Sequence, residues 1–235
     1  MNTRFAACLA PALWACTLPC WAGRPLASDD AATTDPRTCQ IETWVARAEG
    51  QKALTLAPAC GLVAGVELGA DYTQPHPRDG APSAGGLALK WAPASWALAT
   101  GAGELAFGLK LNAGYERASG SSWQRTGAGL LGLATWQPHA DWAVHANLGA
   151  AQDRASDTTA RLLNLAVTWA PIEQALLFAE TQTNNRREVF GNAVHSTGAR
   201  WWLQKDRLGL DLTAHRSSGT STAWTVGLGW YGLGF

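Results

Sequence analysis

The sequence carries no excess charge of either sign and, beyond its first two dozen residues, no long apolar segment. Lysine plus arginine number 18, and aspartate plus glutamate also number 18, so no net field would attract nucleic acid. The absence of an apolar run of about 18 residues in the remaining chain excludes a transmembrane helix there. Hydrophobic residues nonetheless make up 47% of the chain at a mean hydropathy of -0.08. Apolar and polar residues are therefore finely interspersed, as in a sheet with one apolar and one polar face.

Residues 1–22 have the pattern of a secretory signal peptide. Arg4 supplies the positive charge, a short apolar stretch follows, and small residues occupy the two positions that a signal peptidase reads. We expect cleavage after Ala22, with a site near Ser28 as the alternative. A lipoprotein signal ending at Cys16 is a second alternative.

Two of the five cysteines remain after that cleavage, Cys39 and Cys60. The exported chain would meet an oxidising compartment. A predicted hairpin with its turn at Glu49-Gly50 would bring the two thiols within disulfide reach, so we predict that this bond closes residues 39–60. No further cysteine or histidine nearby completes a zinc site, and we expect no cofactor. The polar residues 23–38 predict a flexible linker.

From residue 61 to residue 235, apolar residues recur at every second position. Along residues 104–115, one face carries only apolar or aromatic side chains, and the other carries polar or small ones. This period of two predicts a strand with one apolar side, because a helix would scatter the same residues around its circumference. Leu109 is thus predicted to face outward, and Asn112 inward.

We count about ten such segments, and the connections between them alternate in length. The segments lie near residues 62–73, 85–92, 103–116, 123–136, 141–152, 159–169, 174–184, 193–203, 207–215 and 221–235. Polar loops such as 185–192 alternate with tight turns such as 138–140, and residues 93–102 form the one longer connection on the short side. This layout predicts an all-β fold: a transmembrane antiparallel up-and-down β-barrel over residues 61–235. The barrel would have twelve strands if the 39–60 hairpin joined the wall.

Aromatic residues gather at both ends of the predicted strands. Those at the short-turn ends are Trp91, Trp136, Trp142, Trp169, Trp201, Trp202, Trp230 and Tyr231, and those at the long-loop ends are Tyr72, Tyr115, Trp123 and Trp224. Two such belts are typical of the two interfaces of a membrane. A soluble β-sandwich, the alternative, would gather large aromatics in the middle of its strands.

The end of the sequence resembles the β-signal of Gram-negative outer-membrane proteins. Phe235 is the terminal aromatic, and Leu233 and Tyr231 alternate behind it. The resemblance implies a barrel in the outer membrane, inserted by the barrel-assembly machinery and surrounded by outer-membrane lipid and lipopolysaccharide. Gly227 and Gly229 depart from the pattern, because such signals carry larger apolar groups at those places.

The positions predicted to face the barrel interior, or lumen, form a strongly polar set. These candidates are Glu67, Asp71, Lys90, Glu104, Lys110, Asn112, His145, Asn147, Glu180, Arg200 and Asp211. Burying so many charges in a soluble core would be prohibitive without pairing. Inside a barrel they either line water or pair into a plug, and about ten strands leave a narrow lumen. Consecutive strands predict a Lys90–Glu104 ion pair near the short-turn mouth.

These patterns favour a non-enzymatic barrel of unknown substrate: a narrow porin-like channel for small solutes, or a structural or adhesive membrane protein. The alternative is a lipid hydrolase. Outer-membrane phospholipases are similar in carrying His, Ser and Asn on barrel strands, and His145 shares an inward face with Asn147. No serine on a neighbouring strand is clearly placed as the nucleophile, however. Arg186, Arg187 and Arg216 in loops suggest contact with lipopolysaccharide phosphates.

Overall fold

The computed structural model describes residues 26–77 and 81–235, and the predicted signal peptide, residues 1–22, lies outside them. Each of the predicted segments forms one strand. The strands are β1 (Thr38–Ala48), β2 (Gln51–Val63), β3 (Val66–His76), β4 (Ser83–Trp91), β5 (Leu98–Thr100), β6 (Gly103–Arg117), β7 (Gln124–His139), β8 (Trp142–Asp153), β9 (Thr158–Ile172), β10 (Ala175–Asn184), β11 (Val194–Gln204), β12 (Leu208–Ser217) and β13 (Ala223–Gly234). The connections contain a 3-10 helix, η1 (Ala94–Trp96), and a one-turn helix, α1 (Arg187–Phe190). The described residues contain no helix long and apolar enough to cross a membrane.

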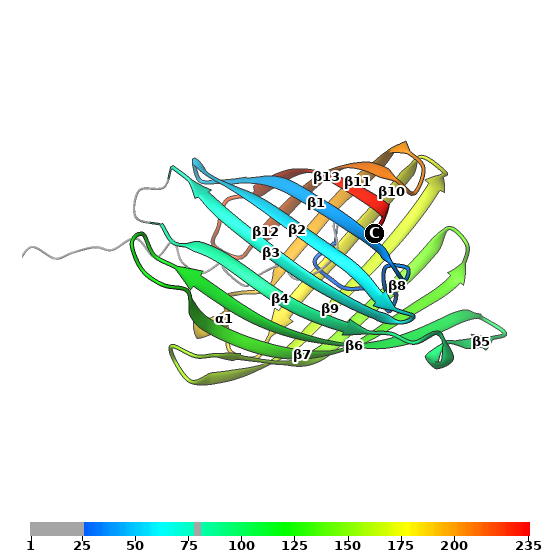
Figure 1. The fold of residues 1–235 in the computed structure, drawn as a ribbon, viewed down its shortest axis with the longest axis horizontal. Coiled ribbons are helices and arrows are strands. Elements are labelled where there is room, and N and C mark those ends of the chain that lie inside the picture. Colours follow the sequence, from blue (N-terminus) through cyan, green and yellow to red (C-terminus); the bar gives the residue numbers. More distant parts are fainter. Residues whose placement is uncertain (1–25, 78–80) are drawn as a thin grey trace, which may run out of the picture.

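The strands form one closed antiparallel barrel (Figure 1). Neighbours in sequence pair with each other around the wall, β1 pairs with β13, and β4 pairs with β6 across the connection that contains β5. The wall therefore has twelve strands, because the hairpin of β1 and β2 belongs to it, and β5 is an additional short strand paired with β6 alone. The predicted alternative of twelve strands, with the hairpin in the wall, is thus confirmed.

The hairpin of β1 and β2 forms as the sequence predicts. Its turn residues Glu49 and Gly50 both have positive φ, at 50° and 81°, as a two-residue hairpin turn matching the strand twist requires. Cys39 lies directly opposite Cys60, and the two form a disulfide. The predicted disulfide is thus confirmed.

We expect removal of this disulfide to destabilise the barrel. The bond joins residues 21 positions apart, and loss of a loop of this size costs about 3 kcal/mol in the chain-entropy model. The Cys39→Ser/Cys60→Ser double variant should therefore unfold from lipid vesicles at a lower urea concentration than the oxidised native chain. The reduced native chain is the matched control and should unfold with the variant. Equal midpoints for all three would show that the bond does not constrain the hairpin.

The two ends of the barrel differ. At the short-turn end lie the start of β1, the last residues of β13 and the tight turns, such as the one between β7 and β8. At the loop end lie the longer connections, including residues 185–193 with α1. The longer connection of residues 92–102 projects from the short-turn end as η1 and β5 (Figure 1).

The outward face is apolar and carries aromatic belts at both ends. Exposed tryptophans at the short-turn end are Trp91, Trp136, Trp142, Trp169, Trp201 and Trp230, and exposed aromatics at the loop end are Tyr72, Trp123 and Trp224. Trp202 and Tyr231, which were predicted to belong to the belt, lie in the interior, where their rings meet edge to face at 5.6 Å. The reason is the pleat: each follows an outward tryptophan, and successive residues point to opposite faces.

The predicted Lys90–Glu104 ion pair is wrong. In the ladder between β4 and β6, Lys90 lies opposite Lys110. Glu104 belongs to the part of β6 that extends beyond the end of β4, where it lies opposite Ala99 of β5. Residues 92–105 thus form a hairpin extension rather than a plain turn, and this extension separates Lys90 from Glu104 by several positions along β6.

Candidate functional site

A segment of the chain that precedes the wall crosses the lumen. We call residues 26–37 the luminal segment; its first contacts are with β10, on the far side of the barrel from β2. The backbone amides of Ala27 and Ser28 donate to the Glu180 carboxylate, at 3.0 and 2.8 Å to Oε2, and the Ser28 hydroxyl donates to the same oxygen. Glu180 is buried, and these donors satisfy its charge.

Asp29 anchors the segment to three strands. Its carboxylate forms an ion pair with Lys110 Nζ at 2.7 Å and lies 3.5 Å from Lys90 Nζ. Its backbone amide and carbonyl both bond the side chain of Asn147, each at 2.8 Å. Asp29, Lys110 and Asn147 are all buried. Loss of one partner would leave another polar group buried without compensation.

Asp30 extends this charge cluster toward β4. Its Oδ1 accepts a bond from Lys90 Nζ at 2.7 Å, while about half of its side-chain surface remains exposed. Desolvation acts to raise the pKa of the Asp30 carboxyl, but the Lys90 ammonium outweighs it and holds the pKa below its usual range. Asp29 and Asp30 thus form ion pairs with Lys90 and Lys110, the two lysines that lie opposite each other on β4 and β6.

The centre of the segment packs on an apolar patch. Ala31 is buried against Leu131 and Leu133, two inward leucines of β7. The Ala31 amide donates to Thr135 Oγ1, which in turn lies 3.0 Å from Nδ1 of His145. The segment is therefore held by burial as well as by charge.

The segment ends against β3 and β2. The amide and hydroxyl of Thr34 both donate to Glu67 Oε2 at 2.7 Å. Pro36 forms a parallel bridge with Gly61, and a β-carbon at Gly61 would collide with the carbonyl oxygens of Thr34 and Asp35. Glycine at 61 thus lets the backbone lie directly on the wall. A flexible linker was expected for residues 23–38, whereas residues 26–37 hold defined contacts across the lumen.

A second buried cluster lies beside the segment, on β11, β12, β13 and β1. The Arg200 guanidinium makes a two-pronged ion pair with Asp211, at 2.7 and 2.8 Å, and Glu42 lies 3.6 Å away. The guanidinium stacks over the rings of both Trp202 and Tyr231, and the Tyr231 hydroxyl donates to Glu42. This arrangement fixes the arginine with charge and aromatic contacts together.

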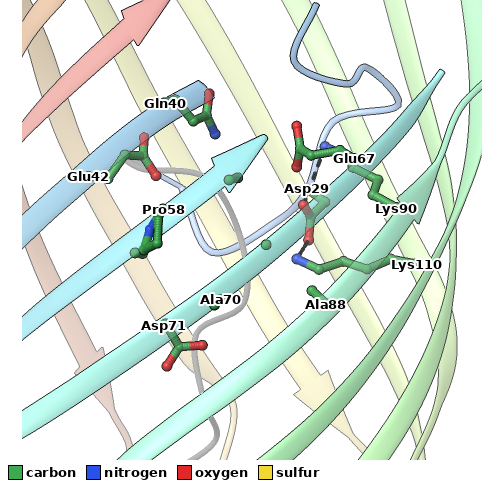
Figure 2. Close-up of a pocket in the computed structure, with 13 residues that line it drawn as sticks. Asp29, Gln40, Glu42, Pro58, Glu67, Ala70, Asp71, Ala88, Lys90 and Lys110 are labelled. Carbon is green, nitrogen blue, oxygen red and sulfur yellow. Dashed lines mark hydrogen bonds and ion pairs between the residues drawn. The ribbon is translucent and has the colours of Figure 1, made fainter. Parts of the chain in front are cut away.

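Two cavities remain beside the luminal segment. One, about 1060 Å³ including open solvent, lies toward the short-turn end and is lined by Ala32, Thr33, His145, Thr168 and Trp202 among others. The other, about 500 Å³ and likewise including open solvent, lies along β2, β3 and β4, where its lining includes Ala57, Ala59, Gly69 and Ala88. Figure 2 shows Ala88 beside Lys90 and Lys110 in this cavity. Asp29, Gln40, Glu42, Glu67 and Lys90 line both cavities. Small inward residues on this side of the barrel therefore leave space that the segment does not fill.

The structure brings most of the predicted lumen residues into one assembly with the segment. Five of them bind the segment directly: Glu67, Lys90, Lys110, Asn147 and Glu180. His145 contacts Thr135, which itself binds the segment, and Arg200 and Asp211 form the neighbouring cluster. Asp71 lines the smaller cavity, and Asn112 lies over Gly129 of β7. Glu104 lies on the hairpin extension and is exposed. The predicted set did not include Asp29, Asp30, Gln40, Glu42 and Trp202, which also belong to this assembly or line its cavities.

The residues of the predicted assembly signal divide between the two faces. Tyr231 is luminal, with its ring lying over Gly229, which explains why that position carries no larger side chain. Leu233 pairs with Cys39 of β1, and the Phe235 amide donates to the Arg37 carbonyl while its side chain is exposed. Their role in assembly stays a prediction.

The charges around the cavities are unbalanced. Of the described residues that line them, five are acids (Asp29, Asp30, Glu42, Glu67 and Asp71) and three are lysine or arginine (Lys90, Lys110 and Arg200). Each of the three cations has an acid within 2.7 Å. Glu67 and Asp71 have no such cation partner among residues 26–77 and 81–235. Water beside the segment therefore faces an excess of negative charge.

Comparison with known proteins places the chain by family and fold. A model of the family described as "Uncharacterised conserved protein UCP029691" matches residues 11–229. No curated protein matches the sequence. Among solved structures, the KdgM porin has a TM-score of 0.60 at 9% identity, over 81% of this chain and 98% of that one. The NanC porin has 0.61 at 6%, over 82% and 98%. Outer membrane phospholipase A from Escherichia coli has 0.52 at 14%, over 88% and 93%. These TM-scores show a shared barrel fold.

Proposed function

The chain belongs to the UCP029691 family, and we propose that it is a narrow, cation-preferring channel for small solutes, constricted by its own luminal segment. The observation that carries this proposal is the pair of cavities left open beside residues 26–37. In a barrel of this size, side chains alone do not fill the lumen. The porin folds of KdgM and NanC support the same function. The proposed preference for cations rests on the acids that line the cavities.

The preference for cations follows from the acids that line the cavities. In a narrow passage a few fixed charges dominate the field that a passing ion meets. The lysines and Arg200 are each neutralised by an aspartate, whereas Glu67 and Asp71 face the space without a basic partner among the described residues. A cation beside them gains an attraction that an anion lacks.

The protein is proposed to lie in the outer membrane of a Gram-negative bacterium, inserted by the barrel-assembly machinery, with its loop end outward. Charge supports this orientation. The described basic residues of the loop end are Arg47, Lys52, Arg117, Arg125, Arg154, Arg161, Arg186, Arg187 and Arg216, and the acids there are Glu49, Glu116, Asp153, Asp157 and Glu188. Nine bases against five acids suit the phosphates of lipopolysaccharide.

A planar-bilayer measurement tests the channel. In a salt gradient, the reversal potential of the native barrel should indicate preference for cations, and Asp71→Asn or Glu67→Gln should reduce that preference. Both changes keep the side-chain shape, and the amide oxygen introduced by Glu67→Gln can still accept the bonds from Thr34. Asp157→Asn, in a loop-end turn, removes the same charge outside the lumen and should leave the potential unchanged.

The alternative, a lipid hydrolase, has weaker support. Nδ1 of His145 contacts the hydroxyl of Thr135, and that hydroxyl is already engaged by the Ala31 amide of the luminal segment. A folded barrel that conducts nothing would overturn the channel, and lipid hydrolysis by the same preparation would establish the alternative.

A further inference from the structure

The hairpin extension at the short-turn end has two chemically different faces. We define it as residues 92–105, which include η1, β5 and the start of β6. Leu98 lies opposite Leu105, and Leu105 lies opposite Trp136, a member of the aromatic belt. The other face carries Ala99 opposite Glu104. Because successive residues alternate, the face with Leu98 continues the lipid-facing surface of the wall.

Two tryptophans of the belt hold the extension from either side. The ring of Trp96, in η1, lies 4.5 Å from the ring of Trp91 at the end of β4. On the other side, the indole N–H of Trp136 donates to the carbonyl of Ala102 at 2.9 Å. Trp91 and Trp136 are themselves 45% and 41% exposed on the outer wall. The extension is therefore positioned at the depth of the belt.

Composition and length together separate the extension from the other turns at the same end. From Ala92 to Gly103 the extension carries no charged side chain, although Leu98 is 54% exposed, and its single charge, Glu104, lies at its base on β6. By contrast, the turns after β7, β9 and β11 carry Asp141, Glu173 and Lys205-Asp206 respectively, and the uncharged turn after β2 is only two residues long. A long uncharged connection projecting into water would be an unfavourable apolar surface.

These observations together point to one partner: we propose that the hairpin extension lies in the interfacial layer of the membrane leaflet next to the short-turn end. This inference does not depend on conduction. Trp96 and Leu98 would face acyl chains, and Ala99 and Glu104 would face water. β5 pairs with β6 on one side only. Its open edge would be costly in hydrocarbon, but headgroups and water at the interface can satisfy it. Tryptophan favours this layer.

A depth measurement with single labelled cysteines tests the proposal. Leu98→Cys and Ala99→Cys in the exported full chain, in which Cys39 and Cys60 are bonded, each receive an environment-sensitive fluorophore. In vesicles, the label at 98 should emit at shorter wavelength and be quenched by lipids spin-labelled near the headgroup. The label at 99 should be quenched by iodide from the water.

Lys205→Cys, in the turn after β11, is the control for full exposure to water, and the unsubstituted chain measures background labelling. Equal access of iodide to positions 98, 99 and 205 would overturn the proposal. Cross-linking of Leu98→Cys between two barrels, with no quenching by lipid, would also overturn it and would assign the extension to contact with a second copy.

Discussion

Deleting residues 26–35 should raise the single-channel conductance of the barrel severalfold. The luminal segment joins β10 to β2 across the lumen, so its removal merges the two cavities into one wider passage. The deletion keeps both Cys39 and the predicted signal peptide. It also removes Asp29 and Asp30, which exposes the ammonium groups of Lys90 and Lys110 to the passage. Ion preference should therefore shift toward anions in the same experiment.

A milder variant separates the effect of the segment's charge from the effect of the volume that the segment occupies. Asp29→Asn/Asp30→Asn keeps the length of the segment and removes its three ion pairs with the two lysines. If the ion pairs hold the segment in place, conductance in this variant should fluctuate between the native and the wide level. Asp35→Asn is the matched control, because Asp35 offers its carbonyl rather than its carboxylate to Thr38. Native conductance in a folded deletion variant would mean that the segment is not the constriction.

The wall could be predicted from the sequence because each strand carries its own signal. Alternation identified the face of Leu109 and of Lys110, and the spacing of polar loops identified the strand order. The adjacent pairs Trp201-Trp202 and Trp230-Tyr231 also carry a signal for the interior. Since neighbours on a strand point to opposite faces, one member of each pair had to enter the lumen.

The luminal segment could not be predicted in the same way. Asp29, Asp30 and Thr34 form an irregular polar stretch whose order comes only from partners distant in sequence, such as Lys110 and Glu180. A composition of this kind is also typical of a flexible linker. The one sign of this segment in the sequence of the wall is Gly61, which has no side chain at the place where the segment meets the wall. A lone glycine in a strand has several explanations, however.

The assignment of the apolar face to the lipid also predicts that a charge placed in the middle of the outer wall should greatly destabilise the barrel. Leu111 lies between Leu89 of β4 and Leu130 of β7, and all three are exposed outward in the middle of the wall, between the two aromatic belts. An arginine at the midplane of a membrane costs roughly 2–4 kcal/mol. Leu111→Arg should therefore lower the free energy of unfolding by about that amount in a urea titration from vesicles.

The matched control places the same side chain on the inner face. Ala57 of β2 lines the smaller cavity, beside the acids that give the lumen its excess negative charge. An arginine there can reach water and Glu42 or Asp71, so Ala57→Arg should cost much less than Leu111→Arg. Because the two variants add the same charged side chain on opposite faces of the wall, the difference between their losses reports mainly the cost of meeting lipid instead of lumen. Equal losses would mean that the outer surface at Leu111 is not in contact with acyl chains, and the membrane-spanning assignment of this wall would fail.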